Sequence, residues 1–94
     1  MSMALLRKEK SKVENQIKKL EEKSIDAEDH LKQLNLDFVN PEIACDFVKL
    51  MDVQAEIEKY QNMIDKFANE WLEKNDLLTK LTSLCEQNND NENE

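Results

Sequence analysis

The chain has 94 residues, no glycine and one proline, and its formal net charge is −8. Apolar residues make up 39% of the chain and charged residues 36%. This apolar content is too low for a thick globular core but suits helices with one narrow apolar face. Rossmann and P-loop nucleotide sites need glycine-rich turns, so both are excluded. No apolar run reaches the ~18 residues of a membrane helix and no secretory signal is recognisable, so we expect a cytoplasmic protein without membrane contact.

The N-terminal third follows the seven-residue repeat of a coiled coil. One row of this repeat is apolar throughout and consists of Leu6, Val13, Leu20, Ala27 and Leu34. The second row is interrupted by one charge and consists of Met3, Lys10, Ile17, Ser24 and Leu31. We therefore predict a helix over about residues 3–34, about 48 Å long.

The repeat breaks at residues 35–42, which we predict to be the tip that connects two helices. Asn40, Pro41 and Glu42 form a helix-start signal, with an N-cap residue, a proline at the first helical position and an acid in the first turn. Asp46 then falls where the repeat needs an apolar residue, which allows a separate short helix before the second long one.

The second long helix is predicted over about residues 43–87. Its two rows are Leu50, Ile57, Ile64, Trp71, Leu78 and Cys85, and Val53, Tyr60, Phe67, Lys74 and Leu81. Only one of these residues is charged, so the helix needs a partner along its whole length. Residues 88–94 are asparagine and acid only, and we predict a disordered acidic tail there.

A short connection makes two helices antiparallel neighbours, so the predicted fold is all-α, with two long helices forming an antiparallel coiled-coil hairpin. Facing residues in such a pair have a constant sum of residue numbers. We predict a sum of 84, which places Ser24 opposite Tyr60 and puts Lys10 and Lys74 in one layer. That layer is either a tolerated defect near the open end, or else a local weak point or a site where an anion or an acidic partner docks. Whether the chain is a monomer or a dimer with exchanged helices stays open.

Residues with catalytic or metal-binding chemistry are scattered. His30 has no cysteine or second histidine near it and is expected to be a solvated surface residue. Cys45 and Cys85 are forty positions apart and are expected to be free thiols. A two-helix hairpin offers no concave site that excludes water, so we expect neither an enzyme nor a cofactor or metal site in this chain.

Charge is distributed unevenly along the chain. Residues 1–23 hold seven basic and four acidic side chains, a net +3, whereas residues 24–94 hold six and seventeen, a net −11. On an ideal helix four lysines fall within about 60° of one another, and they are Lys8, Lys12, Lys19 and Lys23. This basic stripe is a candidate for phosphate contacts with nucleic acid, without base specificity. The alternative is a solvated helix face.

Apolar residues outside the two rows give a rival function. Those at the tip either cap the end of the hairpin or present a contact surface; they are Leu36, Phe38, Val39 and Phe47. Leu77 and Leu84 lie just beside the second helix's apolar rows and widen them. Together they suggest a protein–protein interaction or dimerisation module.

Four segments resemble one known family. Residues 4–14 (ALLRKEKSKVE) are similar to the opening of the C-terminal coiled-coil domain of bacterial ABC-F ATPases, the Uup-type domain. Residues 40–47 (NPEIACDF) resemble that family's turn, DPE-(I/L)-x-x-D-(Y/F), with asparagine in place of the usual aspartate. Residues 50–58 (LMDVQAEIE) and 70–73 (EWLE) match two further runs of the family. Both asparagine and aspartate are good N-caps, so the difference puts nothing in doubt.

The resemblance implies a role as one domain of a longer protein. In ABC-F proteins two ATPase domains precede the coiled coil, bind ATP and Mg²⁺, and work on ribosomes. The Uup-type domain is associated with nucleic-acid binding. The expectation is therefore a non-catalytic domain that helps to hold its parent on DNA, rRNA, tRNA or the ribosome. ATP and Mg²⁺ would belong to the parent alone.

Overall fold

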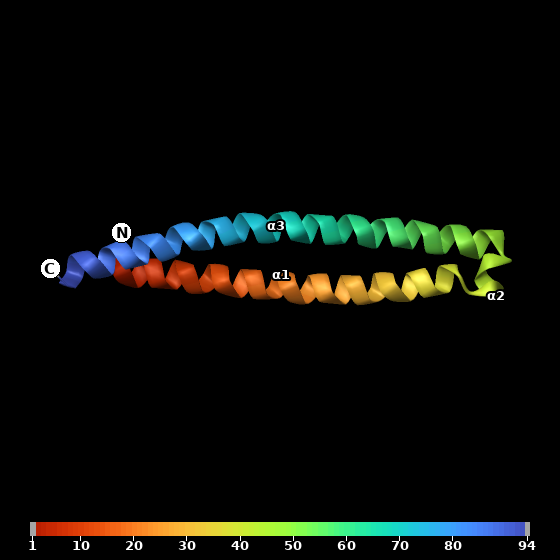
Figure 1. Ribbon diagram of the computed structural model, residues 1–94, viewed down its shortest axis with the longest axis horizontal. Helices are drawn as coiled ribbons and strands as arrows, with labels where there is room; N and C mark the ends of the chain where they lie inside the picture. Colours follow the sequence, from red (N-terminus) through yellow and green to blue (C-terminus); the bar gives the residue numbers. More distant parts are fainter. Residues whose placement is uncertain (1, 94) are drawn as a thin grey trace. The chain divides into compact units, whose positions relative to one another are not determined.

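The computed structural model describes the backbone of residues 2–93 and the side chains of residues 2–88. Within that range it contains three helices, α1 (Met3–Phe38), α2 (Pro41–Ala44) and α3 (Phe47–Asn93). The fold is all-α, and α1 and α3 form an antiparallel coiled-coil hairpin, as predicted (Figure 1). The chain divides into two compact units. We call residues 1–21 with 69–94 the terminal unit and residues 22–68 the tip unit.

The first helix is one turn longer than predicted, because it continues past Leu34 to Phe38. No glycine or proline interrupts this turn, and the Gln33 amide donates a hydrogen bond of 3.2 Å to Asp37 Oδ1. The helix ends before Asn40, whose backbone is extended (φ −67°, ψ 124°). A residue before proline is disfavoured in a helix, so Pro41 determines where α1 ends.

Two side-chain caps begin the next helices. The Asn40 side chain accepts a hydrogen bond from the Glu42 N–H at 3.0 Å, and Pro41 occupies the first turn of α2. Asp46 Oδ1 accepts from the Lys49 N–H at 3.2 Å at the start of α3. Asp46 is therefore a cap and not a seam residue, which explains the separate short helix that its position in the repeat allowed.

The backbone of α3 continues to Asn93, beyond the predicted end at Gln87. The predicted disordered tail, residues 88–94, falls almost wholly on residues whose side chains lie outside those described. That expectation stays a prediction.

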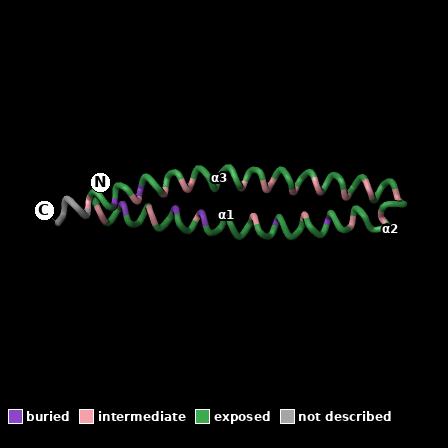
Figure 2. The backbone as a smooth tube through the Cα atoms, in the orientation of Figure 1, coloured by how far each residue is buried: buried purple, intermediate pink, exposed green. Residues whose placement is uncertain are grey.

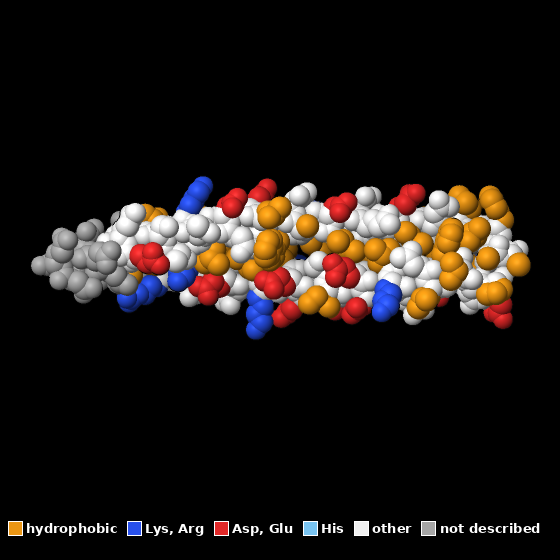
Figure 3. Space-filling view, in the orientation of Figure 1, with side chains coloured by type: hydrophobic (Ala, Val, Ile, Leu, Met, Phe, Trp, Pro, Cys, Tyr) orange, Lys and Arg blue, Asp and Glu red, His pale blue; other side chains and the backbone are white. Residues whose placement is uncertain are grey.

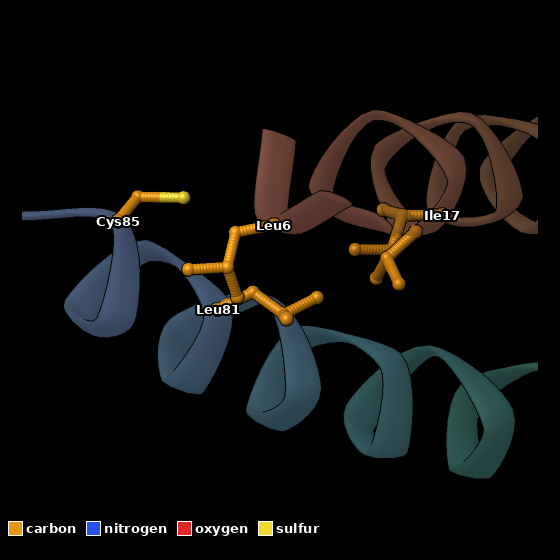
Figure 4. Packing of buried hydrophobic residues seen from close by; sticks show 5 residues of the cluster. Leu6, Ile17, Leu81 and Cys85 are labelled. Carbon is orange, nitrogen blue, oxygen red and sulfur yellow. The ribbon is translucent and has the colours of Figure 1, made fainter. Parts of the chain in front are cut away.

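The terminal unit has a continuous apolar core. Leu6 is only 1% exposed, and it packs in one cluster with residues from both helices (Figure 4). The buried members of this cluster are Leu6, Val13, Ile17, Leu81 and Cys85. Met3 and Leu78 pack against them. Burial of these side chains is the main stabilising contribution in this unit.

The tip unit is packed more sparsely. Among its described side chains only Ala27 and Leu34 are buried. In Figure 2 the tube around α2 is coloured as exposed or intermediate. The apolar rows of α3 in this unit are half-buried, as at Val53 and Ile57. None of the α2 residues is fully buried, and only Ile43 among them is half-buried. The tip unit therefore keeps its apolar rows between the helices but covers them incompletely.

The predicted register is wrong by about one heptad. In the tip unit the His30 ring stacks on Tyr60 with centroids 4.3 Å apart and an interplanar angle of 17°, whereas a sum of 84 places Ser24 there. In the terminal unit Trp71 Nε1 donates to Glu21 Oε1 at 3.4 Å. The residue numbers of these two pairs sum to 90 and 92.

Apolar burial explains the correct register. Placing Lys10 and Lys74 in one layer left Cys85 without a facing residue and brought two like charges together. In the structure Leu81 and Cys85 are buried with Leu6 in the terminal unit, while both lysines are half-buried. Covering the apolar side chain of Cys85 and separating the two lysines outweigh any benefit of placing both charges in one layer.

Candidate interaction surfaces

The tip unit exposes a group of large apolar side chains around α2. Phe47 is 75% exposed, Val39 69% and Val48 67%. Phe38 and Met51 are exposed to 37% and 48%. We call these five residues the tip surface. Hydrophobic side chains gather at the α2 end of the face drawn in Figure 3.

Leu36, which was predicted together with these residues, is also exposed (57%). It lies two positions before Phe38, which comes seven residues after Leu31 and so continues that apolar row to the end of α1. On a helix a separation of two residues places side chains on nearly opposite sides. We therefore treat Leu36 as a separate exposed residue and not as a member of the tip surface.

These exposures bear on the choice left open at the tip, between a cap of the hairpin and a contact surface. A cluster that caps the hairpin would bury its aromatic residues, yet Phe47 is the most exposed large apolar side chain among those described. Of the apolar residues at positions 36–51 only Ile43 and Leu50 are half-buried. The four predicted residues Leu36, Phe38, Val39 and Phe47 are thus presented to solvent.

Two members of the tip surface were missed in the sequence. Val48 and Met51 lie on the outer side of α3, where the heptad repeat normally carries polar residues. With Phe47 they place three large apolar side chains outside the apolar rows in the first five residues of the helix. Apolar residues at outer heptad positions are the sequence signal that could have identified Val48 and Met51 as exposed.

The basic stripe is divided between the two units. Lys8, Lys12 and Lys19 lie on α1 in the terminal unit, and all three are exposed. Lys23 lies on α1 in the tip unit and is also exposed. Lysine is exposed in most proteins, so this arrangement permits contacts with phosphates but does not single them out.

A shallow groove of about 430 Å³ lies on the side of the tip unit. Its lining consists of Lys23, Asp26, Ala27, His30, Tyr60, Met63 and Phe67. The prediction that His30 is on the surface holds, but its ring is also stacked on Tyr60. Lys59 Nζ lies 5.8 Å from the centroid of the same Tyr60 ring.

Leu77 and Leu84, the edge of the terminal unit, are both exposed, and so is Leu5. The two thiols differ: Cys85 is buried and Cys45 is exposed, and both are free. Among the residues that the structure describes, no group of three or more His, Cys, Asp or Glu could hold a metal ion. Likewise, none of the described helices is long and apolar enough to cross a membrane.

Comparison with known proteins adds no further assignment, because no family model, curated protein or solved structure matches the chain.

Proposed function

We propose that this chain is a non-catalytic coiled-coil module that binds another protein through the tip surface. The observation that carries the proposal is the exposure of Phe47, Val39 and Val48, each about two-thirds or more open to solvent. Scattered exposed apolar residues are ordinary, but several that gather at one end of a unit mark an interaction site.

The composition of the tip surface also suits binding. Aromatic residues and methionine are enriched at the centres of protein interfaces, and charged residues are depleted there. A buried phenylalanine contributes about 150–250 Å² of contact area. Phe47 is therefore the expected anchor of the interface. Val39, Val48 and Met51 would surround it and exclude water from the contact.

Site-specific photo-crosslinking in cells tests the proposal. A photoreactive amino acid at Val48 should give discrete protein adducts, and the same amino acid at Leu72 should not. Leu72 is an exposed apolar residue of the terminal unit and is the matched control. Adding Phe47→Ser should reduce the Val48 adducts several-fold. Equal adducts at both positions, or none at Val48, would contradict docking at the tip.

The parent protein is a separate part of the proposal. From the resemblance to the C-terminal domain of ABC-F ATPases, this module would be attached to a larger ATP-binding protein that works on the ribosome. ATP and Mg²⁺ would be held by the parent's other domains. An antibody raised against residues 22–68 should then detect a cellular protein far larger than 11.1 kDa. A band near 11 kDa alone would contradict this parentage.

Nucleic-acid binding is the second candidate function, favoured by the exposure of Lys8, Lys12, Lys19 and Lys23. Lysines spaced along one helix face can neutralise successive phosphates and release their counterions. The net charge of −8 opposes this function outside the basic N-terminal third.

Salt dependence distinguishes this candidate from a solvated helix face. A fluorescent RNA duplex and a DNA duplex should bind at low salt and dissociate at moderate salt. Replacing the four stripe lysines by glutamine should weaken binding and flatten the salt dependence. The control replaces four other exposed lysines, Lys32, Lys49, Lys59 and Lys66, and removes the same charge. If both variants behave alike, the stripe is not the binding site.

A further inference from the structure

The tip surface has an acidic border. Residues 36–52 contain four acids and one base, a net −3. The acids are Asp37, Glu42, Asp46 and Asp52, and the base is Lys49. Glu42 and Asp52 are exposed, and Asp37 and Asp46 are half-buried. Three of the four acids are direct chain neighbours of a tip-surface residue, as Asp46 is of Phe47, so a partner that covers the tip surface meets this charge as well.

These carboxylates can only accept hydrogen bonds. Asp46 Oδ1 accepts from the Lys49 N–H, and Asp37 Oδ1 accepts from the Gln33 amide, both at 3.2 Å. These two local bonds leave the charges in place. A partner that removes water from the border must therefore supply donors, because a carboxylate buried in an interface without a hydrogen-bonding partner is strongly unfavourable.

The same charge argues against a second copy of this chain at the tip. Two tips brought together would place a net −3 against a net −3 around an apolar centre. Like charges that face each other across an interface weaken binding. Phosphate groups of a nucleic acid would be repelled for the same reason.

We propose that the tip surface binds a protein whose complementary apolar face is bordered by lysine or arginine side chains. This inference rests on the proposed function, since it names the partner of the same surface. Phe47 and Val48 would provide the apolar contact, and Glu42 and Asp52 would pair with the partner's basic side chains.

The test uses two synthetic helical peptides as probes. Both have a leucine face; one has lysines along its borders and the other glutamates. Cys45 lies directly after α2 and its thiol is exposed, whereas Cys85 is buried, so a fluorophore can be attached to Cys45 selectively. Its fluorescence then reports binding at the tip. We expect the lysine peptide to bind about tenfold or more tightly than the glutamate peptide.

Variants separate specific binding from general attraction to an acidic chain. Asp37→Asn, Glu42→Gln and Asp52→Asn together should remove the preference for the lysine peptide. The control combines Glu56→Gln, Glu58→Gln and Asp65→Asn, which removes the same charge at exposed positions further along α3 and should keep the preference. Phe47→Ser with Val48→Ser should weaken binding of both peptides at least several-fold.

Each outcome has one meaning. If neither peptide binds the wild-type chain, the proposed function fails. If both bind equally, or if the control and border variants behave alike, only the inference about the partner's charge fails. A dimer of the unlabelled chain that Phe47→Ser with Val48→Ser dissociates would overturn the inference in favour of a second copy. An RNA duplex that changes the Cys45 fluorescence would overturn it in favour of nucleic acid.

Discussion

The terminal unit and the tip unit use apolar side chains in opposite ways. Six of the described side chains in the terminal unit are buried, and only two in the tip unit are. Conversely, seven large apolar side chains of the tip unit are exposed, against five in the terminal unit. The apolar residues of the terminal unit therefore stabilise the fold. Several of those in the tip unit leave most of their surface exposed to solvent.

The two units also differ in the size of their buried side chains. In the tip unit one of the two buried side chains is Ala27, which removes little apolar area from water and lines the lateral groove. In the terminal unit the buried side chains are mostly leucine, isoleucine and valine. Since the hydrophobic contribution scales with buried area, the terminal unit should hold more of the free energy of unfolding.

Removing a core side chain of the terminal unit should have the largest effect. We expect Leu6→Ala to lower the free energy of unfolding by about 2 to 5 kcal/mol, because Leu6 is almost completely buried. Urea unfolding followed by circular dichroism measures it. The matched variant Leu36→Ala, at an exposed leucine of the tip unit, should change it by less than about 0.5 kcal/mol. Equal losses would remove the distinction between the units.

Lys74→Leu should raise the stability of the terminal unit by about 1 kcal/mol. Lys74 is half-buried in an apolar row of α3, where its stem covers apolar neighbours while the ammonium group must reach water. Thermal unfolding should show a higher melting temperature. A lower melting temperature would mean that the ammonium group has a favourable partner.

Loss of a helix cap should affect the tip unit by a similar amount in the opposite direction. Asp46→Ala removes the acceptor for the Lys49 N–H at the start of α3, and such a cap contributes about 1 kcal/mol. Asp46→Asn keeps an acceptor and should cost much less. If the two variants are equally unstable, the charge of Asp46 matters more than its capping bond.

Trp71→Phe should have the smallest effect. It removes the 3.4 Å hydrogen bond from the indole N–H to Glu21 in the terminal unit but keeps an aromatic ring. Exposed side-chain bonds of this kind contribute less than about 1 kcal/mol. A double-mutant cycle with Glu21→Ala, which removes the acceptor, measures the coupling. A coupling above about 1.5 kcal/mol would show that this contact helps to determine the register.

The heptad rows were sufficient to predict two long helices and their antiparallel pairing. They could not determine the register, because a repeat of seven matches itself again after every heptad. We therefore predicted the register that places Lys10 and Lys74 in one layer. The structure instead has the register that buries Leu81 and Cys85. At the tip, the sequence showed that Phe38 and Phe47 lie near a turn. It did not show whether they fold back onto the helices, since periodicity describes helix faces and not turns.

The most direct test of the account is the free energy of unfolding of Phe47→Ser combined with Val48→Ser. Both side chains are at least two-thirds exposed, so a surface that serves binding predicts a change of about 1 kcal/mol or less. A loss of several kcal/mol, comparable to that expected for Leu6→Ala, would show that these residues stabilise the fold. The tip surface would then be part of the hairpin's own packing, and its role as a binding site would be contradicted.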